Sequence, residues 1–266
     1  MQMHGQISYH PNLNPSLGNH KNNKILQRCL VYTPAGYDDA EGGSYPVLYL
    51  LHGVGDMEFS WEVHGRATAI LDELLQDKLI EPFLVVMPFG FESDQQKQKR
   101  EFPTKVWVDG YLKQLLDDVE RAYKIVVGTT VDGRYVKRAI AGLSMGGKQA
   151  LEFGLEHLDC FSAIGNFSGA IQQRSVMAPF PDLLATCQAK QDQLTKLAVF
   201  YHGCGKSDSI GGNSRDSLLN TNRRLVAELG KLNIPHLWHE MEGDHSWGVW
   251  KACLREFLPI VASAWR

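Results

Sequence analysis

The chain has 266 residues and a formal net charge of −3, from 27 basic and 30 acidic side chains. Hydrophobic residues make up 44% and charged residues 21%, values that fit a globular protein with a large core and exclude a disordered chain. No long run of Lys or Arg offers a track for phosphates, so nucleic acid is not an expected partner.

No stretch reaches the roughly 18 apolar residues of a membrane span, so we expect no membrane association. The first twenty residues are polar and lack the apolar core of a signal peptide. We therefore expect a soluble protein, either cytoplasmic or secreted after removal of a leader.

Strand and helix patterns alternate along the chain, which predicts an α/β fold with a mostly parallel sheet and helices on both faces. Apolar or alternating runs predict strands over residues 25–34, 47–53, 83–88, 135–142, 161–168, 197–203 and 235–241. Helical spacing of apolar residues predicts helices over 66–78, 110–124, 146–157, 214–232 and 247–259.

Two segments, 91–105 and 171–196, do not follow this alternation. Long irregular segments in compact domains are often functional, so we expect both to be substrate-binding insertions. No repeat or linker divides the chain, and we expect one domain over residues 1–266.

The cysteines and histidines show no metal-binding spacing. The five cysteines are an odd number without a C-x-x-C pair, so most should be reduced and packed. His236 and His239 lie three apart in a predicted strand, which places their side chains on opposite faces. Cys204 and His202 are better spaced, but two ligands do not make a site. We expect no metal.

A possible nucleophile lies between one predicted strand and the helix that follows it. Gly142-Leu143-Ser144-Met145-Gly146 forms a G-x-S-x-G pattern in that position. Such an elbow holds serine on a strained turn, where small neighbours let the backbone pass closely and the hydroxyl enters the cleft. This context predicts Ser144 as the nucleophile of an α/β-hydrolase.

Serine needs a histidine base, and α/β-hydrolases order the catalytic residues as Ser, acid, His. The histidines that follow Ser144 are His157, His202, His236, His239 and His245. Only His245 falls in a loop between the last predicted strand and the last helix, where the base belongs. For the acid we favour Asp208, in the glycine-rich loop after residues 197–203, over Asp216 in a predicted helix and Asp244 in a predicted turn.

An oxyanion hole requires two backbone N–H donors, one from the residue after the nucleophile and one from an earlier loop. Met145 supplies the first. The second should come from the loop of Gly53, Val54 and Gly55, and the pattern alone does not choose among these three.

Together, the segments "SYPVLYLLHGVGDMEFSW", "AIAGLSMGG", "NFSGA", "GCGKSD" and "GDHSWGVWKACLREFLP" resemble the esterase-D-like esterases of carbohydrate esterase family 1. That family includes feruloyl esterases, acetylxylan esterases and mycolyltransferases. The resemblance spans about residues 25–259 and implies an α/β-hydrolase fold, no metal or organic cofactor, and the catalytic set Ser144, Asp208 and His245. It also implies that Val54 completes the oxyanion hole and that Trp61 closes its loop, although Asp56 stands where the family often has a second glycine.

The expected reaction is ester hydrolysis through an acyl-enzyme, on a small-molecule or polysaccharide-linked ester. We predict a feruloyl ester as the preferred substrate because aromatic and apolar side chains could line a planar pocket: Trp61, Trp107, Met177 and Phe180. The alternatives are a short-acyl esterase (acetylxylan, siderophore or trehalose esterase, or S-formylglutathione hydrolase), an acyltransferase of the mycolyltransferase type, and a non-catalytic binding module with the same fold.

Overall fold

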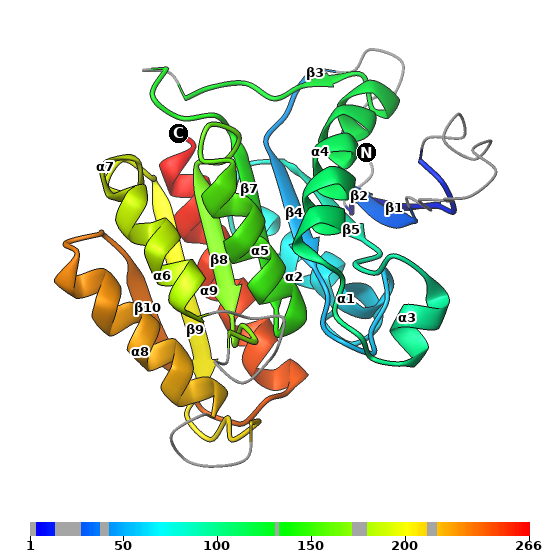
Figure 1. Cartoon of the computed structure of the whole chain (residues 1–266). Coiled ribbons are helices and arrows are strands. Elements are labelled where there is room, and N and C mark those ends of the chain that lie inside the picture. Colours follow the sequence, from blue (N-terminus) through cyan, green and yellow to red (C-terminus); the bar gives the residue numbers. More distant parts are fainter. Residues whose placement is uncertain (1–3, 14–27, 38–42, 131–132, 172–179, 212–216) are drawn as a thin grey trace.

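The computed structural model describes residues 4–13, 28–37, 43–130, 133–171, 180–211 and 217–266. Their centre is an eight-stranded sheet (Figure 1). In spatial order its strands are β1 (Gln6–His10), β2 (Cys29–Thr33), β5 (Leu84–Pro88), β4 (Val47–Leu51), β7 (Arg138–Leu143), β8 (Ala163–Phe167), β9 (Val199–Gly205) and β10 (Leu237–Met241). Only the β1–β2 and β2–β5 pairs are antiparallel. The predicted fold class, an α/β-hydrolase type with a mostly parallel sheet, is confirmed.

Helices cover both faces of this sheet (Figure 1). One face packs against α4 (Lys105–Ala122), α5 (Met145–Glu156), α6 (Phe180–Ala189), α7 (Gln191–Leu194) and α8 (Leu218–Lys231). The other packs against α1 (Ser60–Val63), α2 (Ala67–Gln76) and α9 (Trp247–Ala264). No helix among the described residues is long and apolar enough to cross a membrane.

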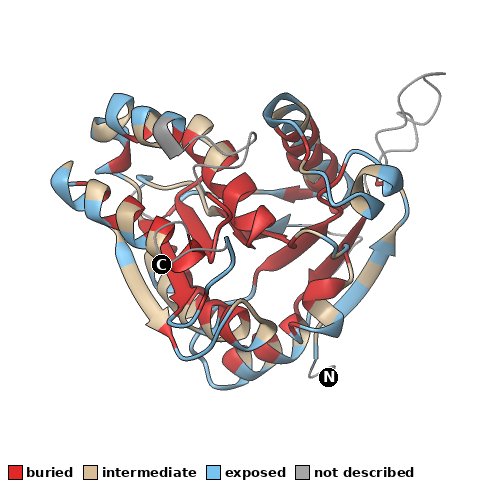
Figure 2. Cartoon of the chain, turned by 60° about the horizontal axis from the view of Figure 1, so that its bottom comes forward, coloured by how far each residue is buried: buried red, intermediate tan, exposed pale blue. Residues whose placement is uncertain are grey.

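The central strands explain why two separate cores form. In β4, Val47, Tyr49 and Leu51 belong to one core and Leu48 and Leu50 to the other, because successive side chains of a strand point to opposite faces. All five residues are buried, as expected for a parallel strand covered on both sides. Figure 2 shows burial concentrated in the central strands and in the helix faces that meet them.

The predicted elements are present with shifted ends, and several elements were not predicted. α4 begins at Lys105, five residues before the predicted start, because Thr104 caps it by accepting a hydrogen bond from the Trp107 N–H. α9 continues past Pro259 to Ala264. The unpredicted elements are β1, α1, α3 (Asp94–Gln98), the short pair β3 (Gly43–Ser44) and β6 (Ile125–Val126), and the helices α6 and α7 inside the second expected insertion.

Candidate active site

The residue at the turn between β7 and α5 is Ser144, and its backbone is strained. Its φ of 51° and ψ of −113° lie in a region that costs a non-glycine residue about 1–3 kcal/mol. Two hydrogen bonds hold it there: the Ser144 N–H donates to the Phe167 carbonyl and the Ala170 N–H donates to the Ser144 carbonyl, both at 2.9 Å. A Cβ at Gly146 would lie 2.5 Å from the His52 carbonyl oxygen, so this turn requires glycine there.

Ser144, His245 and Asp208 form a continuous hydrogen-bonded relay. The Ser144 hydroxyl lies 2.9 Å from His245 Nε2, and His245 Nδ1 lies 2.8 Å from Asp208 Oδ2. With Nδ1 protonated and donating to the carboxylate, Nε2 is free to accept the serine proton. The structure thus brings together the three residues that the sequence indicated for catalysis, from loops after β7, β9 and β10.

The acid of this relay is shielded from water. Asp208 is only 1% exposed, and its carboxylate accepts hydrogen bonds beyond that of His245. The Ile210 N–H donates to Oδ1 at 3.4 Å, and the Cys204 thiol donates to Oδ2 at 3.7 Å. Burial raises the pKa of Cys204 to about 12, so the thiol remains a donor at neutral pH. From the sequence, Cys204 was considered as a packed residue or a metal ligand, and not as a partner of Asp208.

The expected oxyanion donors lie beside the nucleophile. Met145 is the first residue of α5, so its N–H has no intrahelical acceptor. Gly53, next to Val54, is close enough to the nucleophile that a Cβ built on it would lie 3.6 Å from the Ser144 Cβ. Within the described part of the chain, neither the Val54 nor the Met145 N–H donates to a protein acceptor, which leaves both available to a substrate oxygen.

A buried histidine fixes the loop that carries Val54. His52 Nδ1 donates to the Gly53 carbonyl at 2.8 Å, and its Nε2 accepts from the Gly90 N–H at 2.9 Å. Gln149 on α5 donates to the Gly90 carbonyl at 3.0 Å. Burial lowers the pKa of His52 to about 4, so the ring stays neutral and keeps Nε2 as an acceptor. No role was assigned to His52 from the sequence.

An apolar cluster adjoins the oxyanion loop, and sequence reasoning missed most of it. Phe89, Phe91 and Met145 are buried together, and the partly buried Val54 and Phe102 pack against them. Phe89 and Phe91 follow β5 directly, and Phe102 comes from the segment 91–105. The position of this cluster after a buried strand was the available signal, because loops at this edge of a parallel sheet line ligand sites.

Of the four residues expected to bind substrate, the two whose side chains are described, Trp61 and Trp107, pack on opposite faces of the sheet. Trp61 has no exposed surface: it donates from Nε1 to the Leu51 carbonyl at 3.0 Å and its ring meets Trp247 edge-on. It therefore supports the loop after β4 from beneath, which corrects its expected place in the wall of the pocket. Trp107 is half-buried, stacks on Tyr111 at 4.8 Å, and packs against the core on the α4 face.

The other two residues expected to bind substrate are Met177 and Phe180. Met177 lies outside the described residues, and so does the side chain of Phe180, the first residue of α6. Asp216, the rival acid, also lies outside them. Of the rejected histidines, His157 pairs with Asp109 and His239 with Glu256, so both have structural partners away from Ser144.

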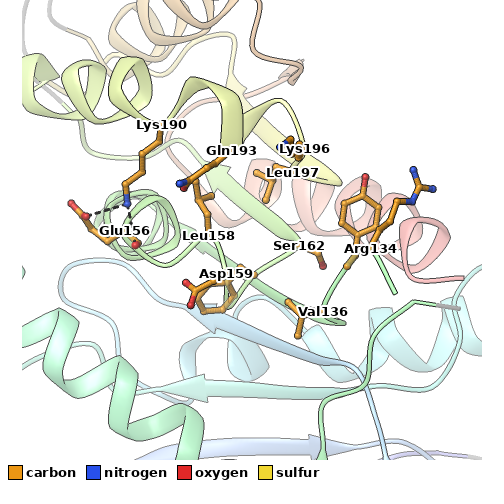
Figure 3. Close-up of a pocket in the computed structure, with 12 residues that line it drawn as sticks. Arg134, Val136, Glu156, Leu158, Asp159, Ser162, Lys190, Gln193, Lys196 and Leu197 are labelled. Carbon is orange, nitrogen blue, oxygen red and sulfur yellow. Dashed lines mark hydrogen bonds and ion pairs between the residues drawn. The ribbon is translucent and has the colours of Figure 1, made fainter. Parts of the chain in front are cut away.

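A pocket of about 570 Å³ lies at the opposite edge of the sheet (Figure 3). Its lining includes Val136, Ser162 and Leu197, which precede β7, β8 and β9. Lys190 points toward Glu156 there and donates to the Leu155 carbonyl at 2.8 Å, which satisfies the last turn of α5. This pocket is separated from the Ser144 relay by the length of the strands.

Comparison with known proteins decides the family. The model of the family called Esterase, described as "Putative esterase", matches residues 27–260, which is most of the chain and includes the whole relay. The chain belongs to the Esterase family.

One sequence relative and two solved structures that resemble this chain are described as feruloyl or ferulic acid esterases. An alignment of 153 residues, which covers 54% of the chain, shows 36% identity to an endo-1,4-beta-xylanase/feruloyl esterase of Xylanibacter ruminicola and covers 20% of that protein. The match thus spans about a fifth of that relative. A solved ferulic acid esterase superposes with a TM-score of 0.77, 19% identity and full coverage of both chains. A CE1 ferulic acid esterase of Anaeromyces mucronatus, solved with ferulic acid, gives 0.70 and 19% over 98% of this chain and 92% of that one. The resemblance to carbohydrate esterase family 1 is confirmed.

Proposed function

We propose that this chain is a serine carboxylic-ester hydrolase that cleaves carbohydrate-linked acyl esters, with feruloyl esters of plant cell-wall polysaccharide preferred. The observation that carries the proposal is the relay of 2.9 Å and 2.8 Å from Ser144 through His245 to the buried Asp208. A serine placed on a strained elbow, hydrogen-bonded to an oriented histidine, is the arrangement that activates a hydroxyl for acyl transfer.

The proposed reaction has two stages, acylation of Ser144 and hydrolysis of the acyl-enzyme. Ser144 Oγ attacks the ester carbonyl carbon while its proton passes to His245 Nε2, and Asp208 stabilises the imidazolium. The carbonyl oxygen becomes an oxyanion held by the Val54 and Met145 N–H groups. The alcohol leaves with the proton from Nε2, which gives the acyl-enzyme. Water then attacks this ester, with His245 as base, and releases the acid and free Ser144.

The apolar cluster supports an aromatic acyl group. Phe89, Phe91 and Met145 are buried, and the partly buried Val54 and Phe102 pack against them. An aromatic acyl group held at the oxyanion loop would meet these apolar side chains and would bury more area than an acetyl group. Solved proteins of the same fold are named ferulic acid esterases, which also supports this choice.

The nucleophile is tested by Ser144→Ala. We expect turnover of methyl ferulate and of a chromogenic acetate ester to fall by about 10³-fold or more, because the relay then has nothing to deprotonate. Folding should be retained, as judged by circular dichroism and the melting temperature. A variant that keeps most of its turnover would overturn the proposal.

The acyl preference is tested by a panel of substrates on the wild-type protein. We expect the highest kcat/KM on methyl ferulate and feruloylated arabinoxylan. The alternative short-acyl activities are represented by acetylated xylan, S-formylglutathione and a siderophore or trehalose ester, and acyl transfer by product analysis with excess sugar acceptor. A higher kcat/KM on acetylated xylan than on methyl ferulate would reverse the choice of acyl group but leave the esterase mechanism in place.

A further inference from the structure

The segment 91–105 carries a cationic group onto the loop that holds Val54. The guanidinium of Arg100 lies over Gly55: a Cβ built on Gly55 would be 3.6 Å from Nε, 3.6 Å from Nη2 and 3.7 Å from Cζ. Because these three atoms are nearly equidistant, the plane of the guanidinium faces the loop. Gly55 has a φ of +85° and no side chain, which leaves this space open.

The backbone role of Arg100 does not explain its side chain. It ends α3 in the left-handed conformation, with a φ of 54°, and its N–H donates to the Lys97 carbonyl at 3.0 Å. Glycine or asparagine is usual at such a position because the left-handed conformation costs other residues about 1 kcal/mol through steric contacts.

Segment 91–105 carries four cations, of which Lys105 pairs with Glu156 and Lys97 acts at longer range on the Asp56 carboxylate of the loop that holds Val54. Among the ion pairs of the described residues, none includes Arg100 or Lys97. Arg28, in contrast, pairs with Asp94 at the start of α3 and with Glu58, and lies 3.8 Å over the Phe89 ring. These contacts anchor the segment against the apolar cluster, so that its positive groups are presented beside the oxyanion loop.

We propose that Arg100, assisted by Lys97, forms a subsite for a carboxylate on the alcohol portion of the substrate. The inference rests on the proposed esterase function and names its substrate class: esters whose leaving group carries an acidic group, such as a feruloylated saccharide containing a uronic acid. Arg100 and Gly55 are exposed, so a charged sugar that contacts them stays in solvent, whereas the proposed acyl group meets the apolar side chains next to Val54. Arginine suits this role because its planar group binds carboxylates through two parallel hydrogen bonds.

A carboxylate on the leaving group could also come from a substrate other than a saccharide. Glutathione also carries carboxylates in the leaving group of S-formylglutathione, so both substrates belong in the test. A saccharide uronate is favoured here because the adjoining cluster of Phe89 and Phe91 is suited to an aromatic acyl group rather than to formyl.

The test compares Arg100→Gln with a matched control, Lys78→Gln. Lys78 is also an exposed cation at a helix end, with a φ of 57° and an N–H that donates to the carbonyl three residues earlier, but it follows α2, away from the oxyanion loop. Substrates are methyl ferulate, a feruloylated oligosaccharide with a uronic acid, its methyl-esterified and therefore neutral form, and S-formylglutathione.

For Arg100→Gln we expect kcat/KM on the uronate-bearing ester to fall about three- to tenfold, the size of an exposed charge-assisted contact, with a change under about twofold on both neutral esters. The wild-type preference for the charged ester should shrink as NaCl is raised, and Lys78→Gln should match the wild type. A selective loss on S-formylglutathione without loss on the saccharide would assign the subsite to glutathione and overturn the saccharide. Equal losses on charged and neutral esters, or no loss on any, would overturn the subsite while leaving ester hydrolysis intact.

A binding measurement keeps the subsite testable independently of turnover. In the Ser144→Ala background, calorimetry with the uronate-bearing ester should give a Kd about three- to tenfold higher when Arg100→Gln is added. An unchanged Kd would overturn the subsite even if the chain hydrolysed no ester at all.

Discussion

Acid should destabilise this protein through His202, a histidine with no part in the relay. His202 lies on β9 and is fully buried, and its Nδ1 accepts a hydrogen bond from the Asn166 side-chain amide at 3.1 Å. Burial lowers the pKa of His202 from 6.5 to about 3, so the folded state keeps the ring neutral. The perturbation is His202→Gln, which removes the titrating group and retains a polar side chain.

The expected size follows from proton linkage. His202 becomes protonated below pH 6.5 in the unfolded chain but only below about pH 3 in the folded chain. Stability from this residue is therefore complete above pH 6.5 and is lost as the pH falls toward 3. The slope approaches about 1.4 kcal/mol per pH unit, so the free energy of unfolding should fall by about 2 kcal/mol between pH 7 and pH 5 from this residue alone.

Urea denaturation at pH 7, 6 and 5 measures this loss. We expect His202→Gln to be less stable than the wild type at pH 7, because the hydrogen bond with Asn166 is disturbed, but to lose about 2 kcal/mol less on acidification to pH 5. His64 is exposed, so His64→Gln serves as the control and should keep the wild-type slope. Parallel curves for the wild type and His202→Gln would refute the reasoning.

Three further outcomes are expected at the site. Asp208→Asn should lower kcat on methyl ferulate by about 10³- to 10⁴-fold with little change in the melting temperature, since the amide favours the wrong histidine tautomer; near-normal kcat would contradict the relay. Gly146→Ala should abolish soluble expression or activity, because its Cβ would lie 2.5 Å from the His52 carbonyl oxygen; a stable, active variant would show that the elbow can shift. Trp61→Phe should lower the free energy of unfolding by about 1–3 kcal/mol through the unpaired Leu51 carbonyl, and a direct substrate contact would be indicated if KM rose without any loss of stability.

The relay was predictable because its three residues follow recognisable strands, and the topology of the sheet brings the ends of those strands together. Ser144, Asp208 and His245 each follow a strand whose apolar pattern is visible in the sequence, and the carboxyl ends of parallel strands meet at one edge of the sheet. The Cys204 contact with Asp208 was less accessible, since a buried thiol is ordinarily only a small apolar side chain. Its distance of 3.7 Å to the carboxylate depends on how the loop after β9 turns back.

Predictions that depended on side chains from different loops were weaker. Trp61 was expected to meet substrate, but its indole donates inward to Leu51 because a buried N–H requires an acceptor. Phe102 joins the cluster of Phe89 and Phe91 only because the segment 91–105 folds back over β5. No periodicity encodes such a contact between an irregular segment and a strand end, so sequence patterns located the segment but not its partner.

The relay is fixed by the sheet, whereas Arg100 lies on an irregular segment outside it. We therefore expect the relay to set kcat and Arg100 to set the choice of substrate. Strands β7 and β9 are buried, and their hydrogen bonds fix where Ser144 and Asp208 emerge. Arg100, in contrast, stands on a short helix end that touches the oxyanion loop but is not part of the sheet. Changes to the relay should therefore act on kcat for every ester, whereas changes to Arg100 should act on the choice between esters. A variant of the segment 91–105 that lowered kcat equally on all substrates would show that the segment also holds Val54 in place.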